Sequence, residues 1–287
     1  MTGHDDIRIG TLARAAEGAS YIEKIIPHGF ESFQIFIWQH IGDINLKALA
    51  KDVKAVLESA NTDVQPVVSS LGMFGNPLSD AQTEKDFAKC IDLCEAFGCD
   101  IVAGFAGSVP GASVPDAMKR YKQVYTKLAR RANDKGVRIA FENCDMGGRW
   151  EDSGNFNIAH APTAWEMMFN EVPDECIGLC WEPCHQMVSL IDPLPQLRKW
   201  VGRVHNVHGK DATIAWDVLR TTGLRGGQTW VWHRTPGFGD TNWTDVITIL
   251  RQGGYTGSID IEGWHDPIYR GDLEMTGQVH GLNYLKA

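Results

Sequence analysis

The feature that most constrains the fold is a regular alternation between short runs rich in β-branched residues and longer segments with helical periodicity. Eight such runs begin at Ile7, Ser32, Val64, Asp100, Val137, Cys176, Arg203 and Gly257. Segments between the runs repeat apolar residues at helical spacing, most clearly from Asn45 to Ser59, Asp80 to Phe97 and Pro115 to Lys135. This alternation predicts parallel strands joined by helices.

The number of predicted strands separates two parallel architectures. Eight strands close a (β/α)8 barrel, the TIM barrel, whereas a doubly wound open sheet is the alternative. The Gly-x-Gly-x-x-Gly turn that is typical of a dinucleotide-binding open sheet follows none of the eight runs. Neither a Pro- or Ser-rich linker nor a change of composition divides the chain. We therefore expect one α/β domain, residues 1–287, folded as a TIM barrel.

Charge and composition exclude several kinds of partner. The net charge is −9 and no Lys/Arg-rich run occurs, so a nucleic-acid-binding surface is not expected. No run approaches the ~18 apolar residues of a membrane span, and the first ten residues lack the features of a signal peptide. The seven cysteines have no disulfide-like spacing and are expected to be reduced, buried apolar residues. These features predict a soluble, cytoplasmic protein.

Four consecutive predicted strands end in residues that can bind a metal ion. In a TIM barrel, the C-terminal ends of the strands form the active-site face. The fifth to eighth runs end in Phe141-Glu142-Asn143, Trp181-Glu182-Pro183-Cys184-His185, His205-Asn206-Val207-His208 and Asp260-Ile261-Glu262. We therefore expect the side chains at these four strand ends to meet at one mouth of the barrel.

The alternation of side chains along a strand selects which of these residues face the barrel axis. His205 and His208 are three residues apart and so lie on opposite faces of their strand. We expect His208 to face the axis and His205 to pack among the outer helices. The same alternation predicts that Glu142, Glu182 and Glu262 point inward.

Three inward carboxylates at one barrel mouth require a counter-charge, because their mutual repulsion is strong in a low dielectric. Together with one imidazole and open positions for a substrate, they suit an octahedral divalent ion, first Mn²⁺ and otherwise Mg²⁺ or Co²⁺. Zinc is less favoured, since its sites use thiolate or more imidazole. A single Glu at a strand end is more often a salt-bridge partner, so the hypothesis depends on four consecutive strands ending in the same way.

The motifs in this order resemble the sugar phosphate isomerase/epimerase family, xylose-isomerase-like TIM barrels that include the ketose 3-epimerases. The motifs are Glu142-Asn143, Pro183-Cys184-His185, His208-Gly209-Lys210-Asp211, Arg234-Thr235-Pro236-Gly237-Phe238-Gly239-Asp240 and Ile261-Glu262. Each motif alone is weak, and their combination in this order is specific. Glu182 departs from the family pattern, which usually has the shorter Asp at that position.

The resemblance implies one divalent metal ion bound by four side chains. These are Glu142, Glu182, His208 and Glu262. It further implies that Glu142 and Glu262 transfer protons on opposite faces of a sugar, and that His185 acts with them as a catalytic residue that contacts a substrate oxygen.

Three further residues are expected to bind the substrate. The resemblance assigns Arg234 to substrate oxygens. Trp38, at the end of the second predicted strand, is a candidate for stacking on a sugar, with simple packing as the alternative. Lys210 is a candidate for the pocket, with an ion pair that steadies the loop as the alternative. The segments from Asp145 to Thr163 and from Leu224 to His233 are expected to form a lid or a wall of the pocket.

The activity that the resemblance implies is metal-dependent isomerisation or epimerisation of a sugar, through an enediolate formed next to a carbonyl. The alternative is β-elimination by a carbon–oxygen or carbon–carbon lyase on 3-keto glycosides, such as the catalytic subunit of a C-glycoside deglycosidase. The expected partner is a sugar or sugar glycoside; a homo-oligomer is left open, as is a small partner subunit under the elimination alternative. A DNA-repair barrel of the endonuclease IV type is disfavoured by charge, and a non-catalytic barrel by the complete ligand set.

Overall fold

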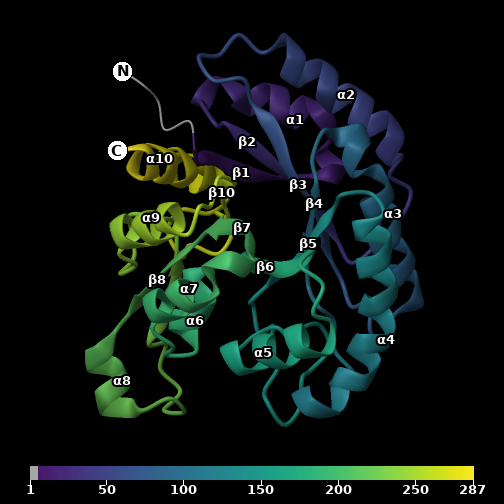
Figure 1. The fold of residues 1–287 in the computed structure, drawn as a ribbon. Coiled ribbons are helices and arrows are strands. Elements are labelled where there is room, and N and C mark those ends of the chain that lie inside the picture. Colours follow the sequence, from purple (N-terminus) through teal and green to yellow (C-terminus); the bar gives the residue numbers. More distant parts are fainter. Residues whose placement is uncertain (1–5) are drawn as a thin grey trace.

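Eight parallel strands close into a barrel within residues 6–287, the part of the chain that this computed structural model describes (Figure 1). Their order around the barrel is β1, β10, β7, β6, β5, β4, β3, β2. The strands are β1 (Arg8–Arg14), β2 (Ser32–Trp38), β3 (Val67–Phe74), β4 (Ile101–Gly104), β5 (Arg138–Glu142), β6 (Ile177–Trp181), β7 (Val204–Gly209) and β10 (Ser258–Ile261). Each predicted run overlaps one strand, so the predicted TIM barrel is confirmed. That residues 1–287 form one domain stays a prediction, because residues 1–5 lie outside the described part.

Helices connect the strands and surround the barrel (Figure 1). They are α1 (Gly18–Ile25), α2 (Leu46–Ser59), α3 (Ala81–Phe97), α4 (Val114–Asn133), α5 (Pro162–Glu171), α6 (Pro183–Val188), α7 (Pro193–Trp200), α9 (Trp243–Gln252) and α10 (Glu274–Lys286). Short 3-10 turns are η1 (Ala15–Glu17), η2 (Ile26–His28), η3 (Val201–Arg203) and η4 (Gly271–Leu273). The three helices expected from apolar periodicity correspond to α2, α3 and α4. Each of these begins at a capping side chain, Asn45, Asp80 or Ser113, that accepts a backbone hydrogen bond.

Apolar side chains fill the space between strands and helices, whereas polar side chains occupy part of the barrel interior. On β2, Phe33, Ile35 and Ile37 are buried in the largest apolar cluster. Gln34, between them in sequence, instead donates a hydrogen bond to Ser70 Oγ of β3 at 2.9 Å. Successive residues of a strand point to opposite faces, so this alternation gives β2 an apolar outer face and a polar inner face.

A buried aspartate lies inside the barrel, two residues before Glu262 on β10. Asp260 Oδ1 accepts a hydrogen bond from Ser32 Oγ at 2.6 Å, and Oδ2 accepts one from Ser69 Oγ at 2.7 Å. Burial raises the pKa of Asp260, and the two serine hydroxyls oppose that shift. Because both of its oxygens have hydrogen-bond partners, Asp260 differs from the carboxylates at the strand ends described below.

Two short antiparallel strands outside the barrel were not expected from the sequence. They are β8 (Asp211–Ile214) and β9 (Val231–Arg234), paired so that Ala212 lies opposite His233. The connection between them contains α8 (Trp216–Thr222), which projects from the barrel at the lower left of Figure 1. Only Lys210 separates β8 from the end of β7, so the hairpin returns His233 to the mouth of the barrel. None of the helices within residues 6–287 is both long and apolar enough to cross a membrane.

Candidate active site

The four residues expected at the strand ends lie close together in the structure. Glu142 ends β5, Glu182 directly follows β6, His208 lies near the end of β7 and Glu262 directly follows β10. One potential ligand atom from each lies within 4.8 Å of every other, and all four residues are buried. The strand order β10, β7, β6, β5 makes their strands successive neighbours. That these residues, the ligand cluster, bind a metal ion stays a prediction.

The imidazole of His208 is oriented toward the three carboxylates. Its Nδ1 lies 3.8 Å from Glu142 Oε2, 3.6 Å from Glu182 Oε2 and 3.5 Å from Glu262 Oε2. The other ring nitrogen, Nε2, lies 3.1 Å from Gln34 Oε1. Because Gln34 Oε1 can only accept a hydrogen bond, it favours a proton on Nε2, so Nδ1 is the ring atom that a metal ion would bind after displacing any proton there. A divalent cation among the carboxylates would lie next to this atom.

Unpartnered buried atoms support the fit of a cation to this cluster. Both oxygens of Glu182 and Nδ1 of His208 are buried without a hydrogen-bond partner. His185 Nε2 lies 3.1 Å from Glu182 Oε1, an ion-pair distance without hydrogen-bond geometry. Buried polar groups in proteins are normally hydrogen-bonded or bound to an ion. The three carboxylates and one imidazole are therefore a suitable donor set for a divalent metal ion.

Lys210 brings a positive charge into the same cluster. Its Nζ donates a hydrogen bond to Glu262 Oε1 at 2.9 Å and lies 3.7 Å from Glu182 Oε1. The residue is only 2% exposed. Burial lowers the pKa of Lys210, but Glu182 and Glu262 outweigh burial and hold that pKa well above its usual range. Lys210 is thus charged, and it neutralises part of the cluster.

The two carboxylates expected to transfer protons have opposite pKa shifts in the metal-free protein. Burial raises the pKa of Glu142 to about 8, with His208 opposing and Glu262 adding to the shift. Burial also raises the pKa of Glu262, but Lys210 and His265 outweigh it and hold that pKa well below its usual range. His265 Nδ1 lies 3.1 Å from Glu262 Oε1. Two carboxylates whose environments separate their pKa values are suited to act as an acid and a base.

A cavity of about 580 Å³ opens above the ligand cluster. This volume is in the range of sites that enclose small-molecule ligands. Its lining residues are Leu12, Arg14, Phe36, Trp38, Phe74, Phe105, Glu142, Cys144, Asp145, Met146, His185, Val188, His208, Lys210, His233, Glu262, Trp264 and His265. One part of the wall is therefore charged and the other is aromatic. Asp145 and Met146, from a segment expected to form a lid or wall, belong to this lining.

The aromatic part of the wall surrounds Trp38. Trp38 is 48% exposed and stacks near Phe36, with ring centres 6.3 Å apart and planes inclined by 15°. Its ring also lies 5.8 Å from that of Phe156 and 6.2 Å from that of Phe105. The wall thus presents an apolar surface to the cavity, and the assignment of Trp38 to substrate binding stays a prediction.

Three imidazoles lie side by side at the charged end of the cavity. The ring centre of His233 is 5.2 Å from that of His185 and 5.6 Å from that of His265. His185 Nε2 is also 3.4 Å from Lys210 Nζ. His233 was not selected from the sequence, because it stands at the end of a segment treated as a lid or wall. Its position before Arg234 in the Arg-Thr-Pro-Gly motif was the available signal.

Arg234 does not belong to the cavity lining. Its Nε donates a hydrogen bond to Asp266 Oδ2 at 3.0 Å, and the backbone N–H of Thr235 donates to the same oxygen at 3.1 Å. This ion pair joins the end of β9 to the loop that follows Glu262. The expectation that Arg234 binds substrate stays a prediction.

His205 lies outside both the ligand cluster and the cavity lining. It packs against β6, where a Cβ on Gly178 would meet its ring Cδ2 at 2.4 Å. Burial lowers the pKa of His205 to about 4, and Arg138 adds to this shift. The residue is therefore buried in its neutral form.

We expect His205 to make the fold sensitive to acid. In the unfolded chain its pKa is about 6.5, so between pH 6.5 and 4 the unfolded chain binds the extra proton and unfolding is favoured as pH falls. Between pH 7 and pH 5 the free energy of unfolding should fall by roughly 2 kcal/mol because of this residue. Urea denaturation of metal-free protein at both pH values measures it. His205→Gln should lose less stability than the wild type over this interval, and an equal loss in both proteins would contradict the assignment.

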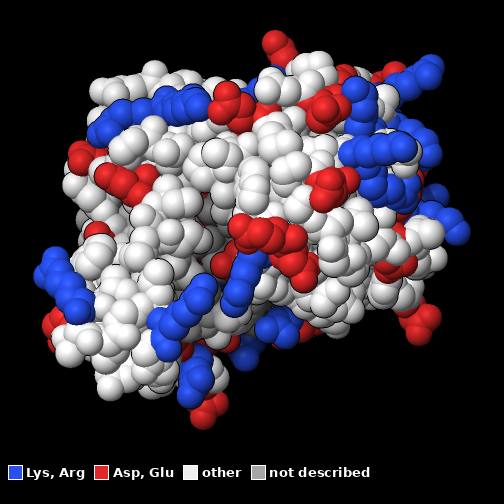
Figure 2. Space-filling model, turned by 90° about the horizontal axis from the view of Figure 1, so that it is seen from below, with Lys and Arg blue, Asp and Glu red and all other residues white. Residues whose placement is uncertain are grey.

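Mixed charge covers the face of the molecule seen from below in Figure 1. Figure 2 shows lysine and arginine side chains interspersed with acidic and many uncharged residues on this face. A protein that binds a nucleic-acid backbone presents a concentrated basic surface instead. This face therefore gives no support to a nucleic-acid partner.

A comparison with known families adds an independent finding. Residues 22–287 match the model of the xylose isomerase-like TIM barrel family. The chain belongs to this family. The match begins within α1 and covers every barrel strand except β1, including all four residues of the ligand cluster.

Individual relatives are distant. An inosose dehydratase from Clostridium botulinum (strain Alaska E43) is 24% identical over 264 residues, covering 82% of this chain and 81% of the relative. The 3-keto-D-glucoside 4-epimerase of E. coli superposes with a TM-score of 0.69 at 16% identity, covering 97% of this chain and 98% of that one. The IOLI protein, solved with a zinc atom, gives a TM-score of 0.64 at 16% identity over 97% and 95% of the chains. These structural likenesses show a common fold.

Proposed function

We propose that this protein removes a proton from the carbon next to a sugar carbonyl, and thus acts as a divalent-metal-dependent sugar isomerase or epimerase. The observation that carries the proposal is the ligand cluster, in which Glu142 of β5 and Glu262 after β10 stand on either side of Glu182 and His208. The family membership and the cavity directly above the pair support it. A sugar with its carbonyl at the cluster would lie between these two carboxylates, one placed to take a proton from carbon and the other to return one.

The residues that would hold the metal ion are Glu142, Glu182, His208 and Glu262. A bound divalent cation would stabilise the negative charge that develops on the carbonyl oxygen when the neighbouring carbon loses its proton. The oxygen-rich donor set favours Mn²⁺, with Mg²⁺ or Co²⁺ as alternatives.

The protein's own side chains divide the proton transfers between them. Glu262, kept ionised by Lys210 and His265, accepts the proton from carbon. The product of this step is an enediolate. Glu142, protonated from solvent, then gives its proton to the opposite face, which inverts that carbon, or to the neighbouring carbon, which moves the carbonyl as the hydroxyl proton passes to the other oxygen. Proton exchange with solvent returns both carboxylates to their starting states. In this proposal His185 donates a hydrogen bond to a substrate oxygen and Trp38 stacks on the sugar ring.

Elimination is a second candidate, and the curated relatives named inosose dehydratase favour it. The first step is unchanged: Glu262 takes the proton next to the carbonyl. The enediolate then expels a group from the β carbon, and the leaving oxygen takes a proton from a neighbouring acid. In this proposal Lys210, which lines the cavity and is charged, supplies that proton. The aromatic wall around Trp38 would accommodate the apolar part of a 3-keto glycoside.

Product analysis separates the two candidates. Manganese-loaded and chelator-treated protein would be incubated with free ketoses and with 3-keto glucosides, and the products identified by NMR. A new sugar isomer supports isomerisation or epimerisation, and a released aglycone supports elimination. Metal-loaded protein that changes no member of either set would contradict both candidates.

Loss of the charge on Lys210 is expected to destabilise the metal-free protein. Lys210→Met leaves Glu182 and Glu262 buried without their cation, and breaking a buried ion pair in this way costs about 3–5 kcal/mol. Added Mn²⁺ should then raise the melting temperature of the variant more than that of the wild type, because the ion replaces the missing charge. Lys199→Met, which removes a surface ion pair with Glu166, is the control. Equal metal-induced shifts in Lys210→Met and the wild type would contradict this role.

Arg234→Ala is expected to raise KM for the sugar about tenfold or more while kcat changes less, as for the loss of a binding contact. Initial rates over a range of sugar concentrations measure both constants. Arg131→Ala, which removes an exposed ion pair with Asp92, is the matched control. An unchanged KM in Arg234→Ala would remove this residue from the substrate site and leave it with its ion pair to Asp266.

A further inference from the structure

The ends of β5 and β6, which carry two carboxylates of the ligand cluster, are joined by the side chain of Asn143. Backbone pairing between these strands stops at Glu142 and Cys180. Beyond that point Asn143 Nδ2 donates a hydrogen bond to the Glu182 carbonyl oxygen, and Asn143 Oδ1 accepts one from the Glu182 N–H, both at 2.8 Å. Asn143 is only 1% exposed. Its amide thus continues the ladder between the two strands and holds both backbone polar groups of Glu182.

Asn157 joins β5 to its other neighbour, β4, in the same way. Its Nδ2 donates hydrogen bonds to the carbonyl oxygens of Glu142 at 2.8 Å and of Cys144 at 2.7 Å. Its Oδ1 accepts hydrogen bonds from two N–H groups, that of Ala106, which follows β4, at 3.0 Å and that of Ala159 at 3.1 Å. Asn157 is fully buried. All four bonds go to backbone, so Asn157 fixes the path of the chain at the end of β5.

Asn157 belongs to the segment from Asp145 to Thr163, which the sequence predicts to be a lid or a wall. Its own backbone is anchored beside the chain that follows β4. Gly107 and Asn157 form a parallel bridge, and the Ile158 N–H donates a hydrogen bond to the Gly107 carbonyl oxygen at 2.9 Å. Movement of the segment at Asn157 would therefore break the bonds that hold the end of β5.

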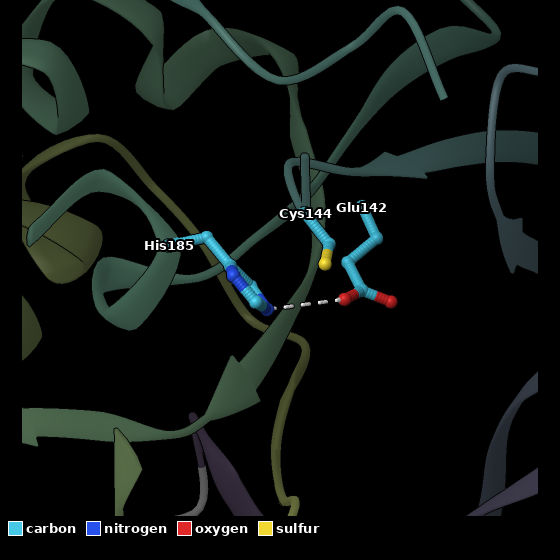
Figure 3. A group of neighbouring side chains, drawn as sticks. All are labelled: Glu142, Cys144 and His185. Atoms are coloured by element: carbon cyan, nitrogen blue, oxygen red, sulfur yellow. Dashed lines mark ion pairs between the residues drawn. The ribbon is translucent and has the colours of Figure 1, made fainter. Parts of the chain in front are cut away.

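The stretch that Asn157 holds carries two side chains of the cavity wall. Figure 3 shows the Glu142 carboxylate and the Cys144 thiol directed to the same side, toward the His185 imidazole. Glu142 Oε2 lies 3.8 Å from His208 Nδ1 within the ligand cluster. A shift of the backbone at Glu142 would thus change the geometry of the cluster directly.

We propose that Asn143 and Asn157, the asparagine pair, are positioning residues that hold Glu182 and Glu142 at the separation that a bound divalent cation requires. Neither asparagine belongs to the ligand cluster or lines the cavity. Carboxylates that converge in a low dielectric repel each other, so their backbones must be held if the metal-free site is to stay ready for the ion. The inference rests on the proposed function, because that proposal assigns a metal ion to the cluster.

Asn76 is a matched control at the same end of the barrel. It follows β3 and is 8% exposed. Its Oδ1 accepts hydrogen bonds from the N–H groups of Leu78, Ser79 and Ser108. Its Nδ2 donates to Ser108 Oγ and to the Asn155 carbonyl oxygen. Asn76 therefore joins the chain after β3 to the chain after β4, and none of these partners belongs to the ligand cluster.

Calorimetric titration of the full-length, metal-free protein with Mn²⁺ tests the proposal through Asn143→Asp, Asn157→Asp and Asn76→Asp. Aspartate keeps the shape and the accepting oxygen of asparagine, but it loses the donating group and adds a negative charge. By charge alone, each variant would bind a cation more tightly. We expect Asn143→Asp and Asn157→Asp to bind Mn²⁺ about 10- to 100-fold more weakly than the wild type, as for the loss of groups that orient metal ligands. Asn76→Asp should bind at least as tightly as the wild type.

Undiminished Mn²⁺ affinity in Asn143→Asp or in Asn157→Asp would overturn the proposal. A loss of affinity in Asn76→Asp as large as theirs would overturn it too, because general loosening of the barrel mouth would then explain all three results. The readout is metal affinity, so wild-type protein that binds Mn²⁺ without exchanging a substrate proton marks a failure of the proposed function and not of this inference.

Amide hydrogen exchange in the wild type provides the test if the variants do not fold. If the asparagine pair favours metal binding, metal binding must favour the hydrogen bonds of the pair by the same free energy. Saturating Mn²⁺ should therefore slow exchange of the Ala106 and Ala159 N–H groups, which Asn157 holds, by about tenfold or more. The Leu78 N–H, which Asn76 holds, should not change. Equal exchange of Ala106 and Ala159 with and without Mn²⁺ would overturn the proposal.

Discussion

Glutamine in place of Glu142 or of Glu262 is expected to lower kcat about 10³-fold, as for the loss of a general acid or base. Glutamine has nearly the shape of glutamate but can neither accept the proton from carbon nor return one. Each residue serves one face of the sugar, so each single variant should lose turnover. Rates would be measured at saturating Mn²⁺ on whichever ketose or 3-keto glucoside the wild type converts.

A control must separate proton transfer from metal loss, because both residues also belong to the ligand cluster. Measuring the metal content of each variant under assay conditions shows whether lost activity comes from lost metal or from lost proton transfer. Glu166→Gln, which alters an exposed carboxylate paired with Lys199, should keep full activity. Full activity in both Glu142→Gln and Glu262→Gln would eliminate the proposed mechanism.

Glutamine in place of Glu182 is expected to lower the affinity of the ligand cluster for Mn²⁺ by at least ~100-fold. This is more than substitutions outside a ligand shell usually cause. Both oxygens of Glu182 are buried without hydrogen-bond partners, and the ion pair with Lys210 reaches only Oε1, which leaves Oε2 for a metal ion. Calorimetric titration with Mn²⁺ measures the change.

Glu182→Asp is the matched control, since it retains the carboxylate and restores the shorter side chain that the family usually has. We expect it to bind Mn²⁺ within about tenfold of the wild type, because charge and donor type are preserved. Equal affinity in the wild type and Glu182→Gln would exclude Glu182 from the metal site. Equal losses in the Gln and Asp variants would indicate that side-chain length, not charge, governs binding.

The barrel and the grouping of its four strand ends followed from local patterns in the sequence. Side chains alternate along a strand, so counting residues placed His208 on the barrel axis. The same count wrongly sent His205 to the outer helices, because the β6–β7 register shifts there and brings its ring against Gly178, on the inward face that Cys180 shares. The C-terminal ends of parallel strands meet at one face of a barrel, so Glu142, Glu182 and Glu262 could be placed together without knowing any distance. Both rules depend on backbone geometry that every residue of a strand shares.

The rest of the site depends on the paths of loops, which no such rule predicts. His233 reaches the cavity because β9 folds back on β8, and its contact with His185 joins residues in different connections. Cys144 fits the expected pattern of a small buried apolar residue, and only its position beside His185 distinguishes it. Arg234 has a motif typical of a substrate contact, yet its partner in the structure is Asp266.

The sequence left two roles open for Lys210. A lysine two residues beyond a histidine is compatible with a loop ion pair or a pocket residue. In the structure Lys210 has both roles, because its Nζ donates a hydrogen bond to Glu262 and the residue also lines the cavity. Its charge compensates the carboxylates and keeps Glu262 ionised.

The measurement that tests the central claim most directly is proton NMR in D₂O of the manganese-loaded protein with free ketoses and 3-keto glucosides. We predict that deuterium enters the carbon next to the carbonyl of at least one compound, that chelation of the metal stops the exchange, and that Glu262→Gln stops it as well. Absence of exchange from every compound despite bound Mn²⁺, or exchange that persists undiminished in Glu262→Gln, would contradict proton abstraction at this site.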